Sequence, residues 1–115
     1  MIDMQQLLSH IRSTYPTLTG GWDERAPEII TEAIILQQVA APTFQEEARA
    51  RLLESRFQAL GLHDVTRDDL QNVYGRTPGG KAGPALLVSA HLDTVFPQGT
   101  PLEVRHDHAS GRIYG

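Results

Sequence analysis

The chain has 115 residues, of which 40% are hydrophobic and 21% are charged, and its formal net charge at pH 7 is -4. This composition is typical of one small globular domain and excludes a disordered segment. Acidic and basic residues are interspersed, which excludes the basic patch of a nucleic-acid-binding protein. Because the chain has no cysteine, disulfides, thiolate metal sites and cysteine nucleophiles are excluded as well.

The N-terminus and the apolar runs of the sequence indicate where the protein resides. An acidic residue, Asp3, comes almost at once, and no continuous apolar core follows, so the N-terminus does not resemble a signal peptide. The longest apolar-rich run, residues 29–41, contains four polar side chains and is too short to span a bilayer. We therefore expect a soluble, cytoplasmic protein that inserts into no membrane.

Two helices are expected in the first part of the chain. Asp3 can accept hydrogen bonds from the free N–H groups of a first short helix, and Gly20-Gly21 ends that unit. Pro27 suits the first turn of a second helix, because a backbone N–H has no helical partner there. Apolar residues at helical spacing follow it, and Pro42 ends the helix.

A third predicted helix has the clearest boundaries. Thr43, followed three residues later by Glu46, forms the capping-box pattern, in which each side chain bonds the other residue's free backbone N–H. Gly61 is well suited to the C-terminal end of this helix. The side chains expected to form its buried stripe are Ala48, Leu52, Leu53, Phe57 and Leu60.

The second half of the chain has the pattern of extended strands. One short strand is expected around Val65 and another at residues 72–75, followed by a flexible loop at 77–84. The near-continuous apolar run 85–90 is typical of a strand that is buried on both faces. Residues 102–114 are expected to form a hairpin. Helices followed by strands, with one fully buried strand, predict an α/β layered fold.

One glycine-rich segment matches most of a nucleotide-binding pattern. Residues 75–81, GRTPGGK, fit the phosphate-binding loop up to its lysine, but Ala82 stands where a serine or threonine would hold magnesium. A strand follows Gly83-Pro84, whereas a phosphate-binding loop leads into a helix. A solvent loop that joins two strands therefore explains these glycines better than nucleotide binding.

The most informative residues are His91 and Asp93, which follow the buried strand. Ligands gather beyond the carboxyl ends of strands in open α/β sheets. Residues two apart in an extended segment point to the same side, so both side chains can share one polar pocket. A histidine that binds zinc commonly donates its other ring N–H to a carboxylate. The alternative is a capped strand end, in which Asp93 bonds backbone N–H groups and His91 is merely polar.

The other histidines are weaker candidates for metal binding. His106 and His108 flank Asp107 and could form a small metal site. At the tip of a predicted hairpin we expect them to face solvent, because a pair of histidines without further ligands seldom closes a site. His10 and His63 are expected to be surface residues.

The segment SAHLDTVFP, residues 89–97, resembles the first metal motif of the peptidase M-twenty family. These dinuclear zinc hydrolases include glutamate carboxypeptidase, peptidase T, aminoacylase and acetylornithine deacetylase. The resemblance covers most of residues 28–115, with four further segments that agree in order and spacing. They are PTFQEE at 42–47, LGL at 60–62, NV at 72–73 and GRIYG at 111–115.

This resemblance implies the N-terminal portion of a layered zinc-exopeptidase catalytic domain, with helices packed on a mixed sheet, incomplete in this chain. Residues 1–25 would form an N-terminal helix and linker, and residues 26–115 the helices and strands up to the hairpin that follows the metal motif. His91 would ligate one of two zinc ions, and Asp93 would act in the catalytic site by orienting His91. The implied substrate is an amide bond of a small peptide or N-acyl amino acid, cleaved by a metallopeptidase or deacylase.

The family's remaining metal ligands and its general base follow the position that corresponds to Gly115. We therefore expect the 115 residues alone to be inactive, because water activation needs ligands and a base that they lack. The uncovered sheet edge of an incomplete domain would also invite association, for example as a homo-oligomer. The alternative function is a non-catalytic binding or scaffold module that retains the fold.

Overall fold

The structure is a computed structural model that describes residues 3–77, 79 and 83–115. The chain divides into two compact units, Met1–Ala33 and Ile34–Gly115. The described residues form four helices and two small antiparallel sheets, each of two strands. The predicted mixture of helix and strand is thus confirmed at this coarse level. No helix in the described ranges has the length and apolar character needed to cross a membrane.

The first unit is helical. Helix α1 (Met4–Thr14) begins at Asp3, whose carboxylate accepts a hydrogen bond of 3.2 Å from the backbone N–H of Gln5. This confirms the predicted cap. A single turn, α2 (Pro16–Thr19), follows and ends at Gly20. No residue of α1 is buried.

Helix α3 (Trp22–Gln38) begins five residues before the predicted first turn, so Pro27 lies inside the helix. That prediction is wrong because the residues before Pro27 are themselves able to start a helix. The negative side chains of Asp23 and Glu24 in the first turn stabilise the helix by interacting with the positive end of its dipole. Pro27 then removes only one backbone hydrogen bond near the helix start. The helix ends before Pro42, as predicted.

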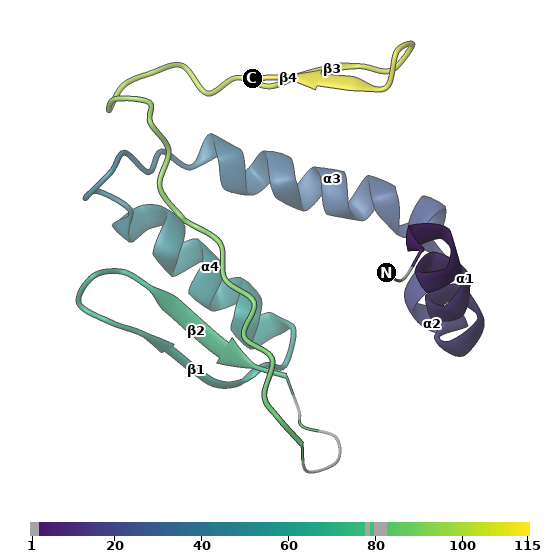
Figure 1. Ribbon diagram of the computed structural model, residues 1–115. Coiled ribbons are helices and arrows are strands. Elements are labelled where there is room, and N and C mark those ends of the chain that lie inside the picture. The colour runs from purple at the N-terminus through teal and green to yellow at the C-terminus, as the bar shows by residue number, and fades with distance from the viewer. Residues whose placement is uncertain (1–2, 78, 80–82) are drawn as a thin grey trace. The chain divides into compact units, whose positions relative to one another are not determined.

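In the second unit, α4 (Glu47–Ala59) packs against a hairpin formed by β1 (His63–Arg67) and β2 (Val73–Arg76) (Figure 1). Gly61 has a left-handed φ of 72° at the end of α4. This conformation lets the N–H of Leu62 reach the carbonyl of Phe57 at 3.0 Å, and the chain then turns into β1. The predictions of two strands and of a glycine cap are confirmed.

The start of α4 differs from the predicted capping box. The hydroxyl of Thr43 bonds Asp93, and the Glu46 carboxylate accepts a hydrogen bond of 2.7 Å from the N–H of Phe44. Phe44 has a left-handed φ of 66°, which separates Thr43 from the helix. The predicted cap is therefore wrong because a tertiary partner takes the Thr43 hydroxyl. The helix itself begins at Glu47.

The buried face of α4 also differs from the predicted stripe. Ala50 is fully buried and Arg49 is only 7% exposed, whereas Leu60 is 75% exposed. Leu52, Leu53 and Phe57 are half-buried and Ala48 is exposed. Apolar spacing alone missed Arg49, because its burial depends on carbonyl oxygens supplied by other segments.

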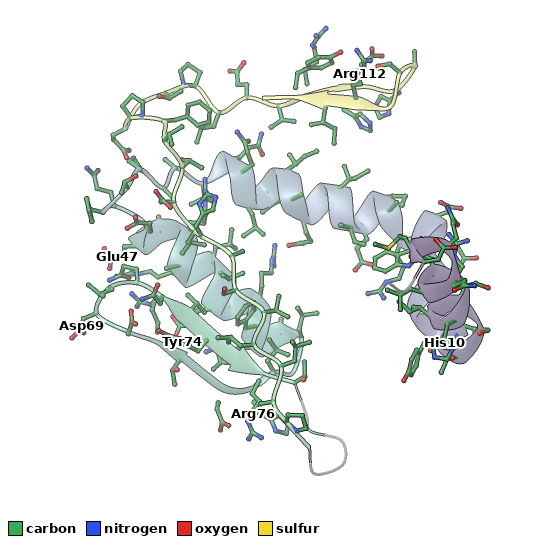
Figure 2. The ribbon with its side chains drawn as sticks, in the orientation of Figure 1. His10, Glu47, Asp69, Tyr74, Arg76 and Arg112 are labelled. Carbon is green, nitrogen blue, oxygen red and sulfur yellow. The ribbon has the colours of Figure 1, made fainter. Side chains whose placement is uncertain are left out.

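The turn between β1 and β2 is organised by one carboxylate. Asp68 accepts hydrogen bonds from the backbone N–H groups of Leu70 and Asn72, from the Asn72 amide and from the Tyr74 hydroxyl. Figure 2 shows Tyr74 on β2 and Asp69 in the turn. These bonds, with that of the Asn72 side chain the largest, lower the pKa of Asp68. The bond to the Asp68 carboxylate raises the pKa of Tyr74.

Residues 85–90 do not form the predicted buried strand. The segment has no assigned strand, and Leu86, Leu87 and Val88 are 89%, 84% and 83% exposed. A strand needs a neighbour for its backbone N–H and C=O groups, and none of the described residues pairs with this segment. Its apolar composition predicts a tendency to be buried but does not supply the covering surface.

The predicted second hairpin is present and shorter than expected. Strands β3 (Arg105–Asp107) and β4 (Arg112–Tyr114) pair in antiparallel register, with His106 opposite Ile113. The carboxylate of Asp107 closes the turn by accepting a hydrogen bond of 2.6 Å from the Ser110 hydroxyl. The side-chain bond with Ser110 is the main reason that the pKa of Asp107 is lowered.

Gly75, the first glycine of the phosphate-loop pattern, belongs to strand β2. A Cβ at this position would lie 2.8 Å from Cδ2 of Phe57 and 2.9 Å from Cδ1 of Leu62. The glycine thus allows Phe57 of α4, and Leu62 just before β1, to approach β2 closely. Residues 78 and 80–82, on which the rest of that pattern and part of the predicted loop fall, lie outside the described residues.

We expect Gly75→Ala to destabilise the second unit by about 1–3 kcal/mol, the usual cost of overpacking a close contact. The matched control is Gly79→Ala, because a Cβ there would meet nothing within 4 Å. Urea unfolding of the three proteins measures the difference. Equal midpoints for Gly75→Ala and Gly79→Ala would contradict the close approach.

Candidate functional site

The structure brings His91 and Asp93 together. The Nδ1 atom of His91 lies 2.9 Å from the backbone carbonyl oxygen of Asp93 and 3.1 Å from its Oδ1. A carbonyl oxygen can only accept, so Nδ1 must carry the hydrogen that is shared with it. The Nε2 atom of the neutral ring then has a free lone pair. Because the His91 side chain is 85% exposed, this lone pair is open to a ligand.

Asp93 is fixed from its other side by Thr43. The Thr43 hydroxyl donates a hydrogen bond of 2.7 Å to Oδ2, and the Asp93 side chain is 29% exposed. This bond is the main reason that the pKa of Asp93 is lowered, and the bond with His91 adds to the effect. The side chains of Thr43, Asp93 and His91 thus form a chain of hydrogen bonds, with Asp93 in the middle. The sequence analysis missed Thr43, because a contact across 50 residues leaves no local pattern.

Backbone pairing holds the two segments of this site side by side. Pro42 and Thr94 form a parallel β-bridge. The backbone N–H of Thr94 donates to the carbonyl of Ala41 at 2.7 Å, and its hydroxyl donates to the same oxygen at 3.3 Å. Ala41 is fully buried. Thr94, which follows Asp93, therefore cannot shift without breaking its bonds to the carbonyl of a buried residue.

Arg49 of α4 contacts the same segment. Its Nη1 donates a hydrogen bond of 2.9 Å to the carbonyl of Leu92, which lies between His91 and Asp93. Burial lowers the pKa of Arg49, and the negative charge of Asp93 opposes this effect. An arginine nevertheless keeps its charge in proteins. The backbone of the motif is thus hydrogen-bonded to a buried, positively charged guanidinium.

The described residues supply a single good metal ligand at this site. They contain no cluster of three or more histidine, cysteine, aspartate and glutamate side chains suited to a metal ion. The rings of His106 and His108 lie with their centroids 3.9 Å apart, but Asp107 between them is engaged by Ser110. His91 with Asp93 therefore fits one coordination position and its orienting partner, and the other positions need further residues.

Comparison of the chain with protein-family models gives no match, and comparison with curated proteins gives none. The resemblance to the peptidase M-twenty family stays a prediction. The chemistry of the site is therefore argued from its residues and their geometry.

We expect Thr43→Val to raise the pKa of Asp93 toward the ordinary value of an aspartate, because the variant removes the hydroxyl that bonds its charged form. Thr43→Ser is the matched control, since it keeps a hydroxyl on the same carbon. Titration of the Asp93 carboxyl carbon by NMR measures both values. An unchanged pKa in Thr43→Val would show that the hydroxyl does not bond Asp93 in solution.

The lowered pKa also predicts how the site responds to acid. Because the pKa of Asp93 is lower in the folded chain, its contribution to stability is complete above the unfolded value of about 3.9. That contribution is lost as the pH falls through the folded pKa. NMR signals of Thr94 and His91 should therefore keep their folded shifts down to a lower pH in the wild type than in Thr43→Val.

Proposed function

We propose that His91 is the first zinc ligand of a hydrolase that cleaves an amide bond in a small peptide or N-acyl amino acid. The observation that carries this proposal is the pairing of Nδ1 of His91 with Asp93 at 2.9 and 3.1 Å, which leaves Nε2 free and exposed. This is the arrangement of a zinc-binding histidine with its carboxylate partner. The resemblance of residues 89–97 to a dinuclear zinc family supports the same function.

Each residue of the site then has a defined task. His91 presents the Nε2 lone pair, Asp93 fixes the ring and its tautomer, and Thr43 holds the Asp93 carboxylate in place. When bound, two zinc ions would supply an activated water and polarise the scissile carbonyl. The other ligands and the general base would come from residues outside this sequence.

The test uses the protein made from its native gene. We expect it to contain zinc and to hydrolyse members of a panel of N-acyl amino acids and dipeptides. We expect His91→Ala to lower both zinc content and hydrolysis. His63→Ala is the matched control, because His63 is an exposed residue at the start of β1. If His91→Ala keeps full zinc content and activity, His91 is not the ligand and the proposal is wrong. A native-gene product with neither zinc nor hydrolysis would favour the non-catalytic binding or scaffold module.

A second prediction concerns the 115 residues alone. We expect this chain to show no zinc-dependent hydrolysis of the same panel, because its described residues contain no cluster of three or more side chains suited to a metal ion. The measurement is release of free amino acid with added zinc, against the native-gene product as positive control. Turnover that disappears with a chelator would contradict the assignment of the other ligands to residues outside the chain.

A further inference from the structure

The Arg49 side chain makes an unusual set of contacts for a charged group. It is only 7% exposed, and every hydrogen bond that it donates goes to a backbone carbonyl. Nε and Nη2 donate to Val39 at 2.9 and 2.6 Å, and Nη2 also donates to Gln37 at 3.2 Å. Nη1 donates to Leu92 at 2.9 Å. One planar group therefore joins the end of α3 to the middle of the His91–Asp93 motif.

The contact with Leu92 has a direct consequence for the metal-binding histidine. The Leu92 carbonyl belongs to the peptide unit that links Leu92 to Asp93. Fixing this unit fixes the start of Asp93, whose carbonyl and carboxylate both accept from Nδ1 of His91. Thr94 is fixed in turn by Ala41. Arg49 thus holds the peptide unit that leads into Asp93.

We propose that Arg49 is a positioning residue, which sets the direction in which His91 presents Nε2 to the metal. This inference rests on the proposed function, since it concerns the same ligand. A lysine cannot replace the arginine here, because an ammonium is a compact point charge without the planar fork that reaches carbonyls on two sides. The side chain donates to the Leu92 peptide and not to His91 itself, and its positive charge also acts on the Asp93 carboxylate.

The test compares zinc affinity by chelator competition in the protein made from its native gene. Partners that orient a metal ligand typically change metal affinity by about 10- to 100-fold when mutated. We expect a loss in this range for Arg49→Lys, which keeps the charge and the aliphatic stem. Gly75→Ala is the control for general loss of stability, because it loosens the α4–β2 contact without touching the motif. We expect its zinc affinity to be unchanged.

A second measurement does not need zinc. In the metal-free protein, the ring nitrogen shifts of His91 report how fully Nδ1 holds its proton, and Arg49→Lys and Arg49→Met should both shift them while Gly75→Ala should not. Unchanged zinc affinity and ring shifts in Arg49→Lys, or equal losses in Gly75→Ala, would overturn the positioning role. Unchanged zinc affinity in His91→Ala would instead overturn the proposed function, and this inference with it.

Discussion

The hydrogen bonds that join residues 41–43 to residues 92–94 are the interaction on which the candidate site depends. These segments lie about 50 residues apart in sequence, and the Thr43 hydroxyl and the Asp93 carboxylate meet at 2.7 Å. The bridge between Pro42 and Thr94 sets the register of the contact. Without these contacts between residues 41–43 and 92–94, His91 would lie on an unpaired extended segment, and its ring would have no fixed orientation. The orientation of His91 and Asp93 therefore depends on tertiary contacts and not on the local sequence alone.

Among the described residues, buried polar contacts accompany a small apolar core. The buried apolar side chains among the described residues include Ala41 and Ala50, and no large side chain there is fully buried. Arg49 lies beside them and satisfies carbonyl oxygens from two segments. Leaving a buried carbonyl without a hydrogen-bond donor costs more free energy than an average hydrogen bond contributes to stability. Loss of the single donor Arg49 should therefore destabilise this arrangement.

The parts of the fold that follow from local rules could be predicted from the sequence. Three features depend only on residues close in sequence: the cap at Asp3, the left-handed conformation of Gly61 and the hairpin at residues 105–114. The predicted start of α3 was wrong for a local reason, because the residues before Pro27 can themselves begin a helix. The other predictions that failed depend on distant partners. Thr43 bonds Asp93 rather than a helix end, and residues 85–90 have no strand beside them among the described residues.

The candidate site shows the same division. The spacing of His91 and Asp93 was sufficient to predict that their side chains meet, because residues two apart on an extended segment share a side. Thr43 and Arg49 were missed, since a hydroxyl in a capping pattern and an arginine on a helix have ordinary local explanations. Their roles depend on where the other segment passes, and hydrophobic periodicity carries no information about that.

The most direct measurement is the position of the proton on the neutral His91 ring, read from long-range ¹H–¹⁵N NMR correlations of the metal-free protein. The ring must be observed at a pH where an ordinary histidine is uncharged. Because both partners of Nδ1 are oxygen acceptors, we predict the proton on Nδ1 and a free lone pair on Nε2. A proton found on Nε2 would mean that the bonds to Asp93 do not form in solution, and the site would have no oriented metal ligand.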